Sequence, residues 1–253
     1  MIRSIFVTIA VLVNLDLGSG VNRNAGSLVA LILARGGSKG IPLKNIVEIQ
    51  PNQTLLGRTL DTVRRSGVFE TVWVSTDHER IAHEAELHGA LVFARSEKHA
   101  QDHSSSLDAT REFLEAHPEI HRFALVQCTS PFLRVHYLEQ ADEQTRYTSE
   151  NVPLATSCAF SVVRSHKLRW RKDDSSGRLE PINFELRARP RRQDWPGELV
   201  ETGMFYFTDR QLVMDEESFQ SVRCTVVEVE ELDALEIDNV KHLEMARLLI
   251  TLN

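Results

Sequence analysis

Two patterns of hydrophobic positions follow one another in turn along the first half of the chain. Short, continuous apolar runs, typical of strands buried on both faces, occur at 28–34, 72–75, 90–94 and 123–127. Between them, 54–66, 76–87 and 105–116 carry apolar residues at helical spacing. Strands that alternate with helices through short connections predict a three-layer α/β/α fold with a mostly parallel, Rossmann-like sheet.

The pattern changes after residue 127. Apolar runs at 155–163, 204–208 and 225–229 predict more strands, and 239–252 has the spacing of an amphipathic helix. Between them, 169–197 is polar, rich in Arg, Pro and Asp, and has no helical period. Long segments of this kind inside a compact domain are usually functional or bound to a partner, so we expect a surface excursion there.

The first 20 residues have the pattern of a secretory signal peptide. One positive charge precedes an apolar run at 5–13, and small and polar residues follow through Gly20. The alternative is an extra buried strand before residue 28. We therefore expect a signal peptide at 1–20 and a single domain at 21–253. Asn52-Gln53-Thr54 is an N-glycosylation sequon, which can be used only if the chain enters the secretory pathway.

Composition is that of an ordinary globular protein, with 42% hydrophobic and 26% charged residues in a chain of 253. The net charge of −7 argues against a general nucleic-acid binder. No stretch reaches the roughly 18 apolar residues that a membrane span needs. Cys128, Cys158 and Cys224 are an odd set without metal-ligand spacing, in or beside apolar segments, and we expect buried free thiols.

The first buried run leads into the glycine loop Arg35-Gly-Gly-Ser-Lys-Gly40. Its glycines allow positive φ and close backbone approach, and consecutive backbone N–H groups form anion-binding nests. Arg35, Lys39 and Lys44 add positive charge. The loop matches neither the Walker A nor the G-x-G-x-x-G pattern. It predicts phosphate binding at the carboxyl end of a strand, with a solvated loop as the alternative.

Two polar clusters follow other predicted strands. Arg95 ends the third strand, and Ser104 to Ser106 precede a helix that they are expected to cap, with Asp108 in its first turn. Both could meet the ligand of the glycine loop, because strand ends of a parallel sheet share one crevice. Gln127 ends the fourth strand, and its amide needs a partner: a neighbouring backbone group is expected, and a base edge is the alternative.

Two charged clusters lie further along. Arg189, Arg191 and Arg192 concentrate positive charge that matches phosphate or carboxylate oxygens, with a solvated charge run or a nuclear signal as alternatives. Glu236 and Asp238 flank an isoleucine, so both carboxylates would face the same way on a strand and suit Mg²⁺. Their alternative role is to cap and charge the start of the last helix.

The string A-R-G-G-S-K-G-I-P-x-K-N at 34–45 resembles the nucleotide-binding signature of the CMP-sialic acid synthetases (N-acylneuraminate cytidylyltransferases). The resemblance extends from residue 28 to the last helix, and the animal members are the most similar. Its further motifs are Trp73-Val-Ser-Thr-Asp77, Ser104-Ser-Ser-Leu-Asp108, Gln127-Cys-Thr-Ser-Pro131, Phe160-Ser-Val-Val-Arg164, Arg189-Pro-Arg-Arg-Gln-Asp-Trp195 and Gly203-Met-Phe-Tyr-Phe207.

The resemblance implies the reaction of CTP with a sialic acid to give CMP-sialic acid and diphosphate. It assigns the catalytic role to Arg191. The excursion at 160–207 would bind the sugar and reach a second subunit, in a homodimer or homotetramer. Lys39, Lys44, Arg192 and Gln193 are expected to bind substrate as well. The positions that contact the nucleotide would be Arg35, Asn45, Arg95, Ser104, Ser106 and Gln127.

The chain departs from the family pattern in two places. Family members usually carry Asp-x-Asp at the metal position, whereas this chain has Glu236 and Asp238; Mg²⁺ is expected there, with Mn²⁺ as the alternative. The N-terminus is signal-like, which predicts the secretory pathway, and the Golgi in particular. The nucleus or cytoplasm is the alternative. A cytidylyltransferase for Kdn or Kdo and a non-catalytic nucleotide-binding homologue remain the competing functions.

Overall fold

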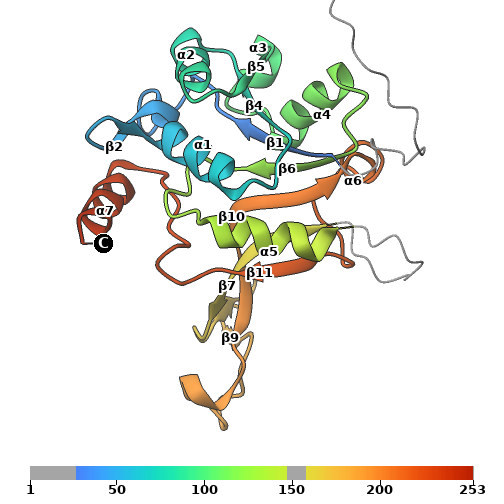
Figure 1. Cartoon of the computed structure of the whole chain (residues 1–253). Helices are drawn as coiled ribbons and strands as arrows, with labels where there is room; N and C mark the ends of the chain where they lie inside the picture. The colour runs from blue at the N-terminus through green and yellow to red at the C-terminus, as the bar shows by residue number, and fades with distance from the viewer. Residues whose placement is uncertain (1–26, 147–157, 253) are drawn as a thin grey trace, which may run out of the picture.

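The computed structural model describes residues 27–146 and 158–252, so the expected signal peptide at 1–20 lies outside the described residues. A seven-stranded sheet forms the centre of the molecule (Figure 1), with the strand order β11-β7-β10-β6-β1-β4-β5. The strands are β1 (Leu28–Leu33), β4 (Thr71–Thr76), β5 (Leu91–Ala94), β6 (Arg122–Val126), β7 (Ala159–Ser165), β10 (Glu198–Asp209) and β11 (Thr225–Glu228).

Most neighbouring strands of this sheet are parallel, which confirms the predicted fold class. β1 pairs in parallel with β4 and β6, β4 with β5, and β7 with β11. β10 is the exception, because it runs antiparallel to both β6 and β7. Two small antiparallel pairs stand apart from this sheet: β2 (Glu48–Gln50) with β3 (Gln53–Thr54), and β8 (Trp170–Lys172) with β9 (Leu179–Pro181).

Helices cover both faces of the sheet, as a three-layer fold requires. Alternate residues of β1 point to opposite faces: Ala30 and Ile32 join one core cluster, and Leu31 joins the other. α1, α2 and α5 pack on the first face, and α4 and α6 on the second. The helices are α1 (Leu55–Ser66), α2 (Glu79–Leu87), α3 (Glu97–Ala100), α4 (Ser106–Ala116), α5 (Val135–Thr145), α6 (Arg210–Met214) and α7 (Val240–Thr251), with 3-10 turns η2 (Lys44–Ile46) and η3 (Arg192–Asp194). Within the described ranges, none of these helices is long and apolar enough to cross a membrane.

The predicted helix at 54–66 is confirmed together with its ends. The side chain of Thr54 accepts a hydrogen bond from the N–H of Gly57, and Gly67 closes the helix at a φ of 65°. The sequence pattern did not predict α5, whose buried face carries the polar residues Asp142 and Thr145. Arg122 donates to the carbonyl of Thr145 and lies 3.8 Å from the Asp142 carboxylate, so these buried polar groups are satisfied.

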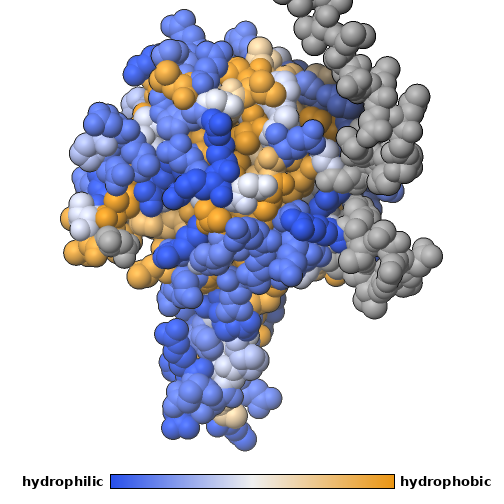
Figure 2. All heavy atoms as spheres, viewed as in Figure 1, coloured by the Kyte–Doolittle hydropathy of each residue, from blue (hydrophilic) through white to orange (hydrophobic). Residues whose placement is uncertain are grey.

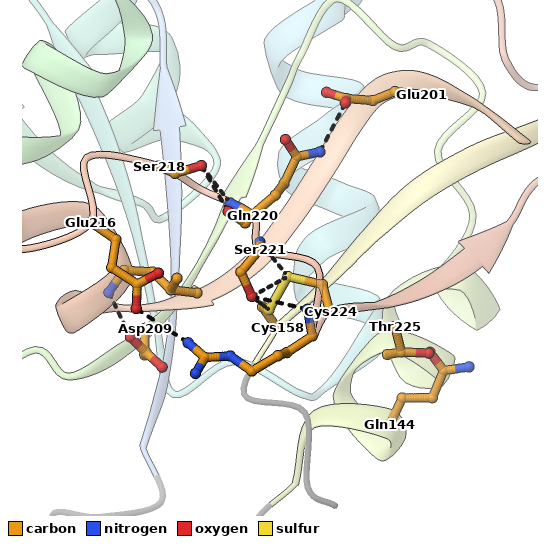
Figure 3. Close-up of a disulfide and its surroundings, with 12 residues drawn as sticks. Gln144, Cys158, Glu201, Asp209, Glu216, Ser218, Gln220, Ser221, Cys224 and Thr225 are labelled. Carbon is orange, nitrogen blue, oxygen red and sulfur yellow. Dashed lines mark hydrogen bonds and ion pairs between the residues drawn. A yellow bond between two sulfur atoms is a disulfide. The ribbon is translucent and has the colours of Figure 1, made fainter.

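Two of the three cysteines are not free thiols, which corrects the expectation from the sequence. Cys158 and Cys224 form a disulfide (Figure 3) and immediately precede the parallel partners Ala159 of β7 and Thr225 of β11. The bridge therefore ties the edge strand β11 to its neighbour. Cys128 is the buried free thiol, and burial raises the pKa of its thiol to about 12.

The polar excursion is an arm that extends from the body of the molecule (Figure 1) and carries β8, β9 and η3. Arg164 forms an ion pair with Glu228 at the base of the arm. Further out, Arg169 pairs with Glu198, and the rings of Trp170 and Phe184 pack edge to face at 5.2 Å. The arm therefore has its own ordered structure, although its sequence has no helical periodicity.

Candidate active site

Two adjoining cavities open where the parallel strands end. The first has a volume of about 240 Å³ and is bounded by residues that directly follow β1, β5 and β6. The second has a volume of about 500 Å³ and extends toward β10. Lys44, Ser106, Gln127 and Thr129 line both. Ligands of parallel α/β sheets bind at this end of the strands.

The first cavity brings together seven of the residues that the sequence nominated for substrate binding. They come from three strand ends, from the η2 turn and from the start of α4, segments far apart in the chain. Among the described residues, no acidic side chain lines this cavity, and its cations are arginine and lysine. Such a lining suits a polyanion such as a nucleoside triphosphate. The seven residues are Arg35, Lys44, Asn45, Arg95, Ser104, Ser106 and Gln127.

Two glycines of the loop, Gly36 and Gly40, allow close approach of other segments, and the expectation of positive φ is wrong for all three glycines. A Cβ on Gly36 would lie 2.7 Å from the ring of His78, and one on Gly40 would lie 2.8 Å from the carbonyl oxygen of Asp238. Within the described chain, the positive-φ glycines all lie after this loop. The N–H of Gly36 donates to Asp77 at 2.8 Å, so this amide is held by a carboxylate and does not belong to a free anion nest.

Asn45 and Arg95 are buried side chains with fixed orientations. Asn45 donates to the carbonyl of Arg35 at 2.9 Å and accepts from the thiol of Cys128 at 3.2 Å. Arg95 donates to the hydroxyl of Ser75 at 3.1 Å and to its carbonyl at 2.7 Å. Burial lowers the pKa of the Arg95 guanidinium to about 10, so it remains a cation at neutral pH. A preorganised cation of this kind suits a bound phosphate or base.

The serines before α4 have the predicted capping role. Ser105 caps the helix and forms a reciprocal capping box with Asp108. The hydroxyl of Ser104 is buried without a hydrogen-bond partner among the described residues and lines the first cavity. The side-chain amide of Gln127 likewise has no partner there, so the expectation of a backbone partner is wrong. Both polar groups are therefore available to a ligand.

Asp102 neutralises the cations of the glycine loop. Its carboxylate lies 3.0 Å from Nη1 of Arg35 and 2.8 Å from Nζ of Lys39. Hydrogen bonding to Lys39 holds the pKa of Asp102 below its usual range. Lys39 is exposed and does not line the first cavity. Nothing in the sequence pattern singled out Asp102, because an isolated aspartate in a polar loop is ordinary.

The second cavity contains one carboxylate of the predicted metal pair. Glu236 lines it, and burial together with the nearby negative charge of Asp238 raises the pKa of Glu236. Residues 235–239 are irregular, so the predicted strand is wrong. The alternating burial expected for 236–238 is still present, because Ile237 is buried while Glu236 and Asp238 are not. The capping alternative is also wrong for Asp238, since Asn239 caps α7.

Two hydrogen bonds fix this irregular segment against the rest of the site. The N–H of Ile237 donates to the carbonyl of Thr129 at 2.8 Å, and Nζ of Lys44 donates to the carbonyl of Ile237 at 2.8 Å. Lys44 also lies 3.6 Å from the Asp238 carboxylate. Within the described ranges, no group of three or more His, Cys, Asp or Glu side chains is placed to hold a metal ion. A metal here would draw the rest of its ligands from substrate and water.

Glu201 and Tyr206 of β10 line the second cavity and were missed by the sequence analysis. The phenol of Tyr206 donates to the Glu201 carboxylate, and burial raises the pKa of that phenol. Although they are five positions apart on one strand, their side chains meet because the pairing of β10 with β7 shifts between them. This irregularity places Gly203 at a φ of 72°, and a strand pattern gives no sign of it.

The arm does not bring its arginines into either cavity. Arg191 is exposed and pairs with Asp194 at 2.8 Å, while Arg192 lies 3.8 Å from Glu231. Arg192 lines a separate recess of about 650 Å³ at the base of the arm, whose other lining residues include Arg164 and Lys167. Arg191, Arg192 and Gln193 therefore lie apart from the strand-end cavities of their own chain.

Comparison with known proteins gives consistent results. The cytidylyltransferase family model matches residues 29–249. N-acylneuraminate cytidylyltransferase A of Danio rerio is 46% identical over 194 residues, which are 76% of this chain and 43% of that protein. The chain thus spans less than half the length of this curated relative. Pseudaminic acid cytidylyltransferase of Campylobacter jejuni is 26% identical over 89% of this chain and 97% of its own.

A solved structure shows the same fold. CMP:2-keto-3-deoxy-manno-octonic acid synthetase, complexed with CTP, superposes with a TM-score of 0.64 over 89% of this chain and 99% of its own. Its sequence identity to this chain is 17%, so the likeness concerns the fold alone.

Proposed function

This chain belongs to the cytidylyltransferase family, and we propose that it activates sialic acid: CTP and an N-acylneuraminate give a CMP-N-acylneuraminate and diphosphate. The observation that carries the proposal is the pair of adjoining cavities with four shared lining residues. One cavity is lined by cations and free polar groups, and the other adds carboxylates and a phenol. Two substrates would meet where Lys44, Ser106, Gln127 and Thr129 line both.

In this reaction the anomeric hydroxyl of the sugar attacks the α-phosphorus of CTP. An oxygen–phosphorus bond forms, the bond to the diphosphate breaks, and the hydroxyl loses its proton to solvent. Negative charge grows on the phosphate oxygens and on the departing diphosphate. Arg35 and Lys39 would release Asp102 and hold these oxygens. Arg95 is held rigidly by Ser75, so little reorganisation is needed to stabilise the charge.

The nucleoside part would occupy the first cavity. The unpartnered amide of Gln127 and the hydroxyl of Ser104 offer hydrogen bonds to a base or a ribose. Asn45 shapes the floor through its bonds to Arg35 and Cys128. Glu201 and Tyr206 would face the hydroxyl-rich sugar in the second cavity.

Mg²⁺ is the proposed cofactor, and Glu236 with Asp238 are its proposed ligands. The two carboxylates lie close enough for the charge of Asp238 to raise the pKa of Glu236, a repulsion that a divalent cation would relieve. Oxygen donors in small number suit Mg²⁺, with Mn²⁺ as the alternative. When bound, the ion would supply charge neutralisation on the phosphate oxygens. Glu236→Ala should sharply reduce the dependence of activity on divalent metal, and an unchanged metal titration would contradict the assignment.

We propose further that the arm serves a second copy of the chain in a homodimer, or in a homotetramer built from such dimers. The arm exposes several large apolar side chains, including Leu179, Leu186 and Trp170, which a partner subunit would cover. Its arginines lie apart from the cavities of their own chain, which a trans contribution to a partner's cavity would explain. Arg191 would then neutralise phosphate charge from the arm.

Complementation between inactive variants tests this arrangement. Arg191→Ala and Lys44→Ala are each expected to be inactive as pure proteins. After subunit exchange, the mixture should recover activity, because a mixed dimer contains one intact composite site. Light scattering gives the subunit number. No recovery in a mixture with demonstrated exchange would contradict a trans role for Arg191.

The proposed location is the secretory pathway, in particular the Golgi. The Cys158–Cys224 disulfide favours an oxidising compartment, and the sequon residue Asn52 is exposed at the turn between β2 and β3. A tagged full-length protein should colocalise with Golgi markers. Its accumulation in the nucleus would overturn this proposal.

The decisive activity assay measures diphosphate release from CTP in the presence of Mg²⁺, across a panel of sugar acids and nucleotides. Release with N-acetylneuraminate supports the proposed function. A preference for Kdn or Kdo would reassign the sugar, and nucleotide binding without release would indicate a non-catalytic homologue.

A further inference from the structure

A large cleft lies away from both active-site cavities. It has a volume of about 930 Å³ and is formed by α1, the end of α2 and the start of α5. Four arginines line it: Arg58, Arg64, Arg65 and Arg134. Figure 2 views this face, where strongly hydrophilic residues gather over α1 and beside α5 with hydrophobic residues between them.

Three of these arginines have no carboxylate partner among the described residues. Arg134 is neutralised by the buried Asp233, but Arg58, Arg64 and Arg65 form no ion pair there. Asp61 is the sole acidic residue that lines the cleft, and His88 holds its carboxylate at 2.8 Å. Positive charge is therefore in excess inside a concave site, in a chain whose net charge is −7.

Arg58 is the most constrained of the three. Its Nε donates to the carbonyl of Pro131 at 2.6 Å, and its Nη1 donates to the side chain of Gln53 at 3.0 Å. Burial and the like charge of Arg65 both lower the pKa of Arg58. The cost of holding two unneutralised cations together would be offset by an anion between them.

The remaining lining suits an anion that also has an apolar part. Leu87, Phe132 and Leu133 contribute hydrophobic walls. The first turn of α5 also faces the cleft at Val135, and no side chain caps this helix, so its N-terminal N–H groups add positive potential. The volume falls within the range of pockets for nucleotide-sized ligands.

The cleft is connected to the active site by one loop. This loop, residues 127–134, has Gln127 and Thr129 near its start, and both residues line the two active-site cavities. It ends at Arg134, which lines the cleft. Between them, the carbonyl of Pro131 accepts from Arg58, and the hydroxyl of Thr129 donates to Glu236 at 3.2 Å. A ligand that moves Arg58 would thus move a loop that carries substrate-binding and metal-site contacts.

We propose that this cleft is a second anion site, which binds a phosphorylated small molecule of nucleotide size and modulates the active site through residues 127–134. Binding to the cleft does not depend on the proposed catalysis. Only the modulation of the active site rests on the proposed function. Failure of the binding and failure of the modulation can therefore be told apart.

Titration calorimetry with two probes tests the binding. Inorganic tripolyphosphate represents the phosphate chain alone, and ADP represents a nucleotide. Both are titrated into the wild-type protein and into Arg35→Ala/Lys39→Ala, which removes cations from the active site. The cleft is altered in Arg64→Gln/Arg65→Gln. Both of its positions are exposed, and thermal unfolding verifies that this variant folds. Arg80→Gln, an exposed arginine on α2, is the matched control.

The active-site variant should retain one equivalent of bound probe. Adding Arg64→Gln/Arg65→Gln to the active-site variant should weaken that binding at least tenfold, whereas adding Arg80→Gln should change it less than twofold. Tighter binding of ADP than of tripolyphosphate would indicate a nucleotide, and the reverse a simple polyphosphate. Either outcome supports the anion site.

Three outcomes would overturn the inference. The active-site variant could lose all probe binding while the cleft variant keeps it, which places the anion in the active site alone. If neither probe binds the active-site variant at millimolar concentration but a polyglutamate peptide does, the cleft is a protein-docking site. Finally, a bound probe that leaves kcat/KM for CTP unchanged in an active wild-type enzyme would refute the modulation.

Discussion

The Cys158–Cys224 disulfide should account for a large share of the stability of this domain. The bridge joins residues 66 positions apart and encloses β7, the whole arm and β10. Closing a loop of that length in the unfolded chain is worth about 4 kcal/mol in the chain-entropy estimate. Domains of this kind are stable by only about 5–15 kcal/mol in total. Reduction should therefore bring the protein close to its unfolding threshold.

Urea unfolding of the purified protein, with and without dithiothreitol, measures this contribution. The oxidised wild type should exceed the reduced wild type by about 2–4 kcal/mol in free energy of unfolding. Cys158→Ser/Cys224→Ser should match the reduced wild type and should not respond to dithiothreitol, which controls for effects on Cys128. Equal midpoints for oxidised and reduced wild type, with the bridge verified by mass spectrometry, would refute the reasoning.

Three further predictions concern single side chains. Asp102→Asn should lower KM for CTP about two- to fivefold with little change in kcat, because the phosphates no longer compete with an exposed carboxylate; initial rates check this, and a raised KM would indicate that Asp102 only orders its loop. Without metal, Glu236→Gln should raise Tm by about 1–3 °C at pH 7.5, because the raised pKa makes the ionised carboxylate unfavourable in the folded state. The gain should vanish below about pH 4, where the wild-type side chain is protonated in both states; a gain that persists at low pH would point to packing instead. Full-length protein from insect cells should shift in gel mobility on glycosidase treatment, and Asn52→Gln should abolish the shift; a wild type that does not respond would contradict use of the sequon.

The first half of the fold could be predicted because its elements are locally encoded. The buried run before the glycine loop is β1, and the helix after it begins at the residue after Thr54 and ends before Gly67, as the capping signals predict. Strand ends of a parallel sheet converge, and this rule placed Arg95 beside the ligand of the glycine loop, whereas Gln127 was assigned to the same site only through the family resemblance.

The parts that sequence reasoning missed depend on contacts between distant segments. Each bridging cysteine stands directly before a strand, but the sequence does not say that β7 and β11 are neighbours. α5 escaped notice because Arg122 satisfies polar residues on its buried face. The role of Gly40 is likewise invisible in its own loop, since it leaves room for the backbone of Asp238 almost 200 positions later.

The same long-range contacts imply that the site residues do not act independently. Thr129 holds the segment that carries the proposed metal ligands twice, through its carbonyl to Ile237 and through its hydroxyl to Glu236. Two residues further on, the carbonyl of Pro131 is fixed by Arg58 from the remote cleft. Substitutions at Arg58 and Glu236 should therefore be non-additive in kcat/KM, although the two side chains line different cavities. A double-mutant cycle with Arg58→Gln and Glu236→Gln measures this coupling, with Arg80→Gln in place of Arg58→Gln as the control. Strict additivity in the first cycle would show that the loop transmits nothing between the two sites.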